Sequence, residues 1–327
     1  MLKVAVVGVG GISGAHIPVW EEMEDAELIA LCDIRPEQME KYENIKHYTD
    51  FEEMLNNEEI DILDICLPTF LHADYAVKAM ERGINVICEK PISLNEEDID
   101  RVYSTAEKYN VKFMVAQVLR FWPEYELLKE IYDTKKYGKL LSGTMTRLGC
   151  YPRWSWDGWM MDEKRSGLVP FDLHIHDLDF MVYAFGIPEI KYQYRSKLPD
   201  QDFFTVNYDF GDFSINTEAS WYATCYPFTA QFRFQFEDAI VANENGKMII
   251  YLRDDEKIDL SEEAEGDTGN INLPKSDAYA NEIHYFFDCV VNDKPVEKIN
   301  PEELSGVLKI LKSIKYIKHQ FIMQLIN

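Results

Sequence analysis

Two separate segments of the chain carry residue types suited to acid–base chemistry. In the first, Lys90 stands directly before a proline, in a segment that follows an apolar run. In the second, Asp172, His176 and Asp179 are spaced four and then three residues apart. On a helix this spacing places the three side chains on one face, which we expect to point into a cleft. The sequence therefore predicts that Asp172 orients His176 as an acid–base group, while the Lys90 ammonium stabilises a developing alkoxide.

The second segment also permits a metal site. His174, His176, Asp177 and Asp179 are all ligand types for zinc, and a metal-assisted lyase or hydrolase would use such a cluster. On a helix, however, His174 and His176 point about 200° apart and cannot share one ion, whereas in a strand they could. We expect no metal here. For His174 two roles stay open, a substrate contact or a structural histidine bonded to the backbone.

The elements that must position these residues begin with a repeated strand and helix pattern over about the first 120 residues. Continuously apolar runs predict strands, and helical spacing of apolar residues predicts a helix over 72–82. A parallel sheet of doubly wound type follows from this alternation, and its ligands bind at the carboxyl ends of strands, where Lys90 lies. The predicted strands are residues 3–7, 28–32, 62–67, 85–88 and 112–115.

A glycine-rich loop follows the first predicted strand, with the sequence Gly8-Val9-Gly10-Gly11-Ile12-Ser13-Gly14. Gly8 permits a tight turn, and Gly10 lets the backbone approach a pyrophosphate at a helix N-terminus. Asp33 ends the second strand about 20 residues farther on, where a carboxylate can bind ribose hydroxyls. The loop and Asp33 together predict dinucleotide binding, with NAD favoured over NADP. NADP is not excluded, because Arg35 could reach a 2′-phosphate.

The pattern changes from about residue 122. Phe232, Phe234 and Phe236 alternate with polar residues, and a second period-two run covers 213–221, which predicts a mainly antiparallel sheet with one face better buried. We expect a dinucleotide-binding domain at 1–121 and a substrate-binding α+β domain at 122–327. An open sheet rich in aromatic residues suits a subunit interface, so a homo-oligomer, dimer or tetramer, is expected. The alternative is that the chain's own helices cover the sheet. Further predicted strands are residues 140–148, 190–196, 203–210 and 248–252.

Composition limits the classes of partner. The chain has 58 acidic and 33 basic side chains, a formal net charge of -25, which disfavours nucleic acid and anionic membranes as partners. No run approaches the roughly 20 apolar residues of a membrane span, and no secretory segment is recognisable, so we expect a cytoplasmic protein. Six cysteines without a C-x-x-C pair are expected to be reduced core residues.

Several short segments resemble the Gfo/Idh/MocA family of oxidoreductases, which includes glucose–fructose oxidoreductase and inositol dehydrogenase. The resemblance implies that Lys90 lies between the nicotinamide and the reacting carbon, and that Asp172 and His176 are the catalytic pair. The chain departs from the family pattern where only Gly167 remains of a glycine-rich run, and where His174 replaces a glycine. The matching segments are GVGGIS with His16, Leu67 to His72, Glu89-Lys90-Pro91, Arg120 to Pro123, Asp172 to Asp179 and the region of Glu282.

The residues and the resemblance together imply an NAD-dependent oxidoreductase that moves hydride between the nicotinamide and a secondary alcohol of a sugar, cyclitol or related polyol. An NAD-binding redox regulator without turnover stays open as the alternative. The implied cofactor-binding residues are Gly8, Gly10, Gly11, Ile12, Asp33, Arg35, Leu67, Pro68, Thr69, His72, Glu89, Lys90 and Gln117. The implied substrate-binding residues are Lys90, Arg120, Trp122, Trp159, Asp172, His174 and His176.

Overall fold

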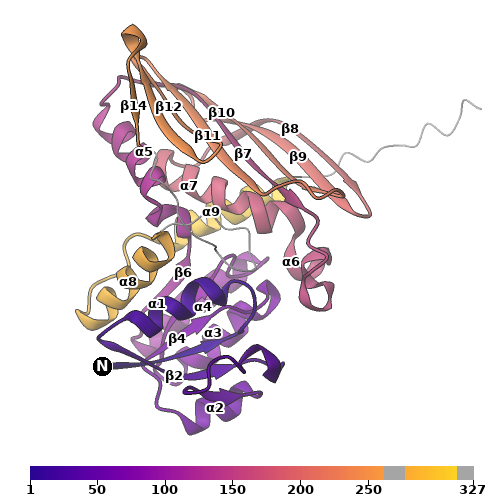
Figure 1. The fold of residues 1–327 in the computed structure, drawn as a ribbon, viewed down its shortest axis with the longest axis vertical. Helices are drawn as coiled ribbons and strands as arrows, with labels where there is room; N and C mark the ends of the chain where they lie inside the picture. Colours follow the sequence, from indigo (N-terminus) through magenta and orange to yellow (C-terminus); the bar gives the residue numbers. More distant parts are fainter. Residues whose placement is uncertain (261–276, 315–327) are drawn as a thin grey trace, which may run out of the picture.

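A computed structural model describes residues 1–260 and 277–314 of the chain. Two sheets dominate it, a six-stranded one built from the first part of the chain and an eight-stranded one built from the second. Figure 1 shows them at opposite ends of the molecule, with helices between and beside them. The predicted α/β class, a doubly wound domain followed by an α+β domain, is confirmed.

The first sheet is parallel throughout, in the order β3-β2-β1-β4-β5-β6. All five predicted strands are present, because each is an apolar run that the flanking helices bury on both faces. The strand that the sequence does not predict, β3, has only three residues and exposes Lys46 and His47, so it carries no apolar signal. The strands are β1 Leu2–Val7, β2 Ala26–Cys32, β3 Lys46–Tyr48, β4 Ile62–Ile65, β5 Asn85–Glu89 and β6 Phe113–Ala116.

Helices from both ends of the chain cover this sheet. The helix predicted over 72–82 is α3, which the structure ends at Met80. A helix from far along the chain, α8 (Ala278–Val291), packs against α1 and β5, so the first layer is completed by the C-terminal part of the sequence (Figure 1). The other helices of this layer are α1 Ser13–Glu22, α2 Phe51–Asn57 and α4 Glu96–Tyr109.

The second sheet has the order β14-β13-β12-β11-β7-β10-β9-β8. Its pairings are antiparallel except between β7 and β10, which run parallel at the centre of the sheet. The strands are β7 Leu140–Cys150, β8 Glu189–Leu198, β9 Gln201–Asp209, β10 Ser214–Tyr222, β11 Thr229–Phe236, β12 Ala239–Glu244, β13 Lys247–Leu252 and β14 Lys257–Asp259.

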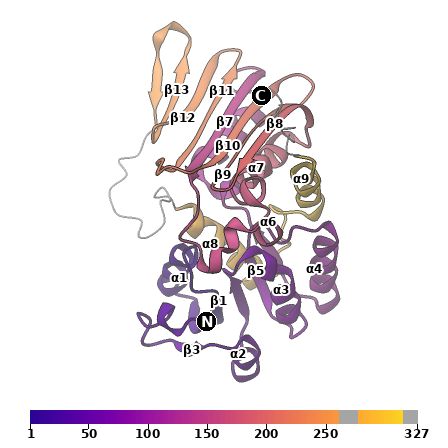
Figure 2. The ribbon, with the colours of Figure 1, turned by 90° about the vertical axis from the view of Figure 1, so that its right-hand side faces the viewer.

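One face of this sheet is covered by helices, as the two views in Figures 1 and 2 show. Phe232 packs edge-on against Tyr125 of α5 (Pro123–Thr134), and Phe234 lies against Phe185 of α7 (Ile175–Phe185). On the same strand Arg233 and Gln235 are exposed. The aromatic side chains of this strand therefore face the chain's own helices, so a subunit interface on this sheet would use its other face.

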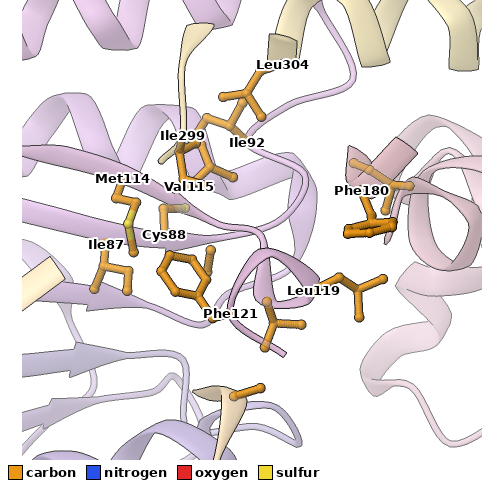
Figure 3. Close-up of a cluster of buried hydrophobic side chains, with 14 of the residues drawn as sticks. Ile87, Cys88, Ile92, Met114, Val115, Leu119, Phe121, Phe180, Ile299 and Leu304 are labelled. Atoms are coloured by element: carbon orange, nitrogen blue, oxygen red, sulfur yellow. The ribbon is translucent and has the colours of Figure 1, made fainter. Parts of the chain in front are cut away.

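An apolar cluster joins the two domains (Figure 3). Ile87 and Cys88 of β5 and Met114 and Val115 of β6 lie on one side of it. The cluster is completed by Leu119 and Phe121 of the connecting 3-10 turn η3 (Val118–Phe121), Phe180 of α7, Ile299, which lies beside Val115, and Leu304 of α9 (Pro301–Ser313). All are buried, so the domains share a continuous core that fixes one against the other. No helix within residues 1–260 and 277–314 has the length and apolarity to cross a membrane.

Candidate active site

The turn after β1 accepts only glycine at its first position. Gly8 has a φ of +88°, and a Cβ there would lie 2.6 Å from the carbonyl oxygen of Cys66. At Gly10 the nearest atom to such a Cβ is Nη2 of Arg35, 3.9 Å away, so the backbone is open to close approach. The α1 N-cap, Ile12, makes no side-chain hydrogen bond, and the N–H groups of Gly14 and Ala15 already donate to the carbonyl oxygens of Gly11 and Ile12. An anion at this helix start would therefore bind the N–H groups that precede Gly14. This cradle fits the pyrophosphate of a dinucleotide.

Asp33 ties the glycine loop to the end of β2. Its side chain is 6% exposed, and Oδ2 accepts a hydrogen bond from the backbone N of Val9 at 2.9 Å. The backbone N of Arg35 donates to Oδ1 at 2.8 Å, and its guanidinium donates to both carboxylate oxygens at 3.2 and 3.3 Å. The carboxylate therefore has a fixed position beside the loop, as the ribose-binding role requires.

Below the loop, a buried histidine links two carboxylates. His16 Nδ1 lies 2.9 Å from Asp64 Oδ2, and Nε2 lies 3.2 Å from Glu89 Oε1. Burial is the largest influence and acts to lower the pKa of His16, but Asp64 and Cys66 together outweigh it and hold this pKa well above the usual value. Because the other oxygen of Glu89 accepts the backbone N–H of Lys90 at 3.0 Å, His16 helps to position the Lys90 turn. Asp64 was not singled out from the sequence, although a carboxylate inside an apolar strand is a signal.

His72 holds the two loops beside this turn together. Its ring nitrogens lie 2.6 Å from the carbonyl oxygen of Leu67 and 2.7 Å from that of Pro91. The side chain is 1% exposed, and burial lowers its pKa. The structure thus places His72 between the loops rather than on a ligand-facing surface, and its predicted contribution to cofactor binding would act through their positions.

Lys90 meets the second domain at Asp172. Its Nζ donates a hydrogen bond to the carbonyl oxygen of Asp172 at 2.8 Å and lies 3.5 Å from the carboxylate Oδ1. Both side chains are mostly buried. Asp172 belongs to a π-helical turn, Pro170–His174, that leads into α7. The two segments that the sequence picks out for acid–base chemistry are therefore in direct contact.

His176 lies near this contact but is not oriented by Asp172. Its Nδ1 is buried and has no hydrogen-bond partner among residues 1–260 and 277–314. The predicted Asp172 to His176 hydrogen bond is absent, because the π-helical turn changes the angle between the two side chains from that of a regular α-helix. Burial first, and then the charges of Lys90 and Arg147, lower the pKa of His176 well below its usual value. The imidazole is thus neutral at neutral pH and can accept a proton.

The two aspartates that follow His176 anchor α7. Asp177 receives hydrogen bonds from Arg147 of β7 at 2.7 and 3.1 Å. Asp179 receives hydrogen bonds from Arg120 at 2.7 and 2.8 Å. Asp179 therefore points into the interior, and the expectation that it shares a cleft-facing surface with Asp172 and His176 is wrong.

Arg120 is fully buried, which contradicts its predicted role as a substrate contact. Besides the Asp179 pair, its Nη1 donates to the carbonyl oxygen of Lys298 at 2.8 Å and to Glu303 at 2.5 Å. All of these hydrogen bonds from Arg120 go to protein atoms at the domain junction. A guanidinium so placed holds the two domains and α9 together.

Replacing Arg120 should therefore cost stability. We expect Arg120→Met to lower the free energy of unfolding by about 3–5 kcal/mol, because it leaves the Asp179 carboxylate buried without its partner. Guanidinium denaturation would measure this. The control is Arg153→Met, whose exposed pair with Asp200 should contribute less than about 1 kcal/mol. Unchanged stability with a raised KM would instead restore the substrate-binding role.

His174 is a structural histidine. It is fully buried, its Nε2 lies 2.7 Å from the hydroxyl oxygen of Tyr208, and the two rings stack with centroids 5.7 Å apart. Burial first, and then the charge of Arg147, lower the pKa of His174 to about 3. Of the two roles that the sequence left open, the substrate contact is contradicted, and the partner is a side chain rather than backbone.

This burial should make the fold sensitive to acid. In the unfolded chain His174 takes up a proton below about pH 6.5, whereas in the folded chain it does so only near pH 3. As the pH is lowered through that interval, this group should therefore reduce the free energy of unfolding by about 1.4 kcal/mol per pH unit. Denaturation at several pH values should show a smaller slope for His174→Gln than for the wild type. The exposed His47→Gln should keep the wild-type slope, and equal slopes for all three would contradict the assignment.

Comparison with known proteins agrees with this geometry. Residues 2–117 match the family described as an oxidoreductase family with an NAD-binding Rossmann fold, and residues 125–241 match the GFO/IDH/MocA C-terminal domain. The chain belongs to the Gfo/Idh/MocA oxidoreductase family. The resemblance drawn from the sequence motifs is thus confirmed for both domains.

Curated relatives of this family are similar over part of their length. A 2,7-anhydro-N-acetylneuraminate hydratase from Mediterraneibacter gnavus is 28% identical over 64% of this chain and 58% of that protein. A myo-inositol 2-dehydrogenase from Thermotoga maritima is 28% identical over 57% of this chain and 55% of that protein. The matches thus span a little over half the length of these relatives. A levoglucosan dehydrogenase solved with NADH and levoglucosan has the same fold, with a TM-score of 0.79, 18% identity and 96% of each chain covered.

Three further predicted site residues are Trp122, Trp159 and Gln117. Trp122 is 9% exposed and packs edge-on against Tyr279 of α8, whereas Trp159 is half-buried. Gln117 is buried, with a side-chain oxygen that has no partner within the described residues. An unpaired acceptor at the end of β6 is consistent with its predicted cofactor role.

One buried carboxyl was noted in the sequence only through the family resemblance. Glu282 of α8 is fully buried, and neither of its oxygens has a hydrogen-bond partner in the described parts of the chain. Burial first, and then the Glu89 carboxylate, raise the pKa of Glu282 well above its usual value. The signal in the sequence is the helical spacing of Glu282, which places it on the buried face of α8 with Ala278, Ile283 and Phe286.

Proposed function

We propose that this chain catalyses the reversible oxidation of a secondary alcohol on a sugar, cyclitol or related polyol, with hydride passing to NAD. The observation that carries the proposal is the contact between Lys90 and Asp172, which joins the carboxyl end of β5 to the turn that leads into α7, the helix of His176. Family membership supports the oxidoreductase class. The named relatives that act on inositol and levoglucosan support a polyhydroxylated substrate.

The residues have separable tasks in this reaction. NAD, when bound, supplies the hydride acceptor. Neutral His176 takes the hydroxyl proton at a ring nitrogen, while the carbon–hydrogen bond breaks with its electron pair and the carbonyl forms. The Lys90 ammonium donates a hydrogen bond to the substrate oxygen as negative charge develops there. Asp172 holds Lys90 in place through its carbonyl and carboxylate oxygens.

For cofactor binding, we propose that the glycine loop and the N-terminus of α1 bind the pyrophosphate and that Asp33 binds the adenosine ribose. The Asp33 carboxylate disfavours a 2′-phosphate by like charge, so NAD should be preferred. Arg35 reduces this preference because its guanidinium lies directly on the carboxylate.

The test is absorbance at the reduced-nicotinamide band with purified protein, NAD or NADP, and a panel of sugars, cyclitols and sugar acids. We expect a rise with NAD and at least one member of the panel. Mass spectrometry of the same reactions separates a rival, because one relative is a hydratase: gain or loss of water without a net absorbance change would indicate a lyase. NAD binding with neither change would favour a redox regulator.

We further propose that residues 1–121 and 122–327 act as the dinucleotide-binding and substrate-binding parts, that the protein is cytoplasmic, and that it forms a homo-oligomer. The surface for self-association is the helix-free face of the second sheet, where Arg233 and Gln235 are exposed. Sedimentation velocity would show a dimer or tetramer, and charge reversal at Arg233 should weaken it. A monomer at micromolar concentration would contradict the proposal.

A further inference from the structure

A bridging segment, defined here as residues 153–166, reaches from the second domain toward the first. It includes a 3-10 turn, Trp156–Met161, and the short helix α6, Glu163–Ser166, which lies between the sheet and the Rossmann domain in Figure 1. Positive φ angles at Asp157 and Gly158 reverse the chain. The hydroxyl of Ser166 donates to the carbonyl of Met160 at 2.7 Å, and Arg165 donates to the Asp157 carboxylate at 3.0 Å. The segment is therefore held by its own hydrogen bonds.

At one end this segment meets Arg35. The guanidinium carbon of Arg35 lies 5.7 Å from the ring centroid of Trp156, within the range of a cation–π contact. The same guanidinium donates hydrogen bonds to Asp33. Arg35 is thus held on two sides, by a carboxylate of its own domain and by an indole of the other.

At the other end the segment meets the loop after β4. The guanidinium carbon of Arg165 lies 4.6 Å from the ring centroid of Phe70. Arg35 follows β2 and Phe70 follows β4, and in the sheet these strands flank β1, which leads into the glycine loop. The bridging segment therefore contacts the Rossmann domain on both sides of the proposed dinucleotide site.

The position of Arg35 matters because of charge. The chain has a formal net charge of -25, which repels an anionic dinucleotide. Nη2 of Arg35 lies 3.9 Å from the position of a Cβ on Gly10, so its cation is beside the open backbone of the loop. A free arginine side chain would have to be ordered when the ligand binds, whereas one already held is preorganised.

We propose that Trp156 is a cofactor-positioning residue supplied by the second domain. It holds Arg35 beside the glycine loop, where the guanidinium offsets the charge of the adenosine diphosphate half of the dinucleotide. The inference rests on the proposed NAD binding and adds to it a residue that acts through Arg35.

The experiment is calorimetric binding of NAD, ADP-ribose and nicotinamide mononucleotide to the full chain. Trp156→Ala should raise the Kd for NAD and ADP-ribose roughly 3- to 30-fold and leave nicotinamide mononucleotide unchanged. The matched control is Trp154→Ala, since Trp154 is 70% exposed. It should bind all three ligands as the wild type does.

A double-mutant cycle tests whether Trp156 acts through Arg35. The variant Arg35→Ala with Trp156→Ala should bind ADP-ribose no more weakly than Arg35→Ala alone. The inference is overturned if the two substitutions raise the Kd for ADP-ribose by factors that multiply, or if Trp156→Ala keeps wild-type affinity. If the wild type turns over substrate and Trp156→Ala binds the ligands as the wild type does, this inference alone is wrong. If the wild type binds NAD tightly but shows no turnover, only the proposed reaction is wrong.

Discussion

Lys90→Met should lower kcat for alcohol oxidation by about 100- to 1,000-fold while leaving the Kd for NAD nearly unchanged. The expected loss is that of one charged donor to a developing alkoxide in a mostly buried site. Methionine roughly keeps the volume of the side chain and removes its charge and its hydrogen bond to the carbonyl oxygen of Asp172. Steady-state rates at saturating NAD would measure the effect.

The control for this variant is Lys108→Met, on the exposed surface of α4. It removes the same charge from the protein and should keep wild-type kcat. Near-native kcat for Lys90→Met would contradict the role of Lys90, and a parallel loss of NAD affinity would show that the lysine binds cofactor instead of acting on the substrate oxygen.

His176→Ala should lower kcat by about 100- to 10,000-fold, because the proton acceptor is removed. In the wild type the acidic limb of the kcat profile should lie well below pH 6.5. Burial lowers the pKa of His176, so the ring stays in its proton-accepting neutral form as the pH falls through that value. In Lys90→Met the acidic limb of the residual kcat profile should shift to higher pH. The Lys90 charge that helps to lower the pKa of His176 is then gone. His47→Ala, on an exposed strand, is the control.

A pH profile of the wild type that falls with a midpoint near pH 6.5 would contradict this environment for His176. Wild-type rates in His176→Ala would remove the residue from the reaction altogether. Either outcome would leave the fold and the dinucleotide site intact and would shift the search for the base to another group near Lys90.

The elements of the first domain could be predicted because burial on both faces leaves a continuous apolar run for each main strand. The glycine loop and Asp33 could be predicted for a similar reason, since steric and charge requirements act on neighbouring residues of the chain. The strand β12 could not, because its residues Ala239–Glu244 are buried in no simple alternation. Short exposed strands and irregular burial leave little trace in sequence.

The site was harder to predict where its geometry depends on residues far apart in the chain. The interior pairing of Arg120 with Asp179 joins positions 59 residues apart, and nothing near either residue signals it. The π-helical turn before α7 removed the helical register on which the orientation of His176 by Asp172 was based. The burial of His174 against Tyr208 likewise depends on how the sheet packs on α7. Residue types were thus informative about chemistry, whereas contacts required the fold.

The most direct test of the account is single-turnover formation of reduced nicotinamide, followed by stopped flow with enzyme and NAD in excess over an oxidisable polyol. Lys90 and His176 are assigned to the chemical step, so the rate of hydride transfer should fall at least about 100-fold in both Lys90→Met and His176→Ala at saturating NAD. A wild-type transfer rate in both variants, with only later steps slowed, would contradict the central claim that these two side chains carry the reaction.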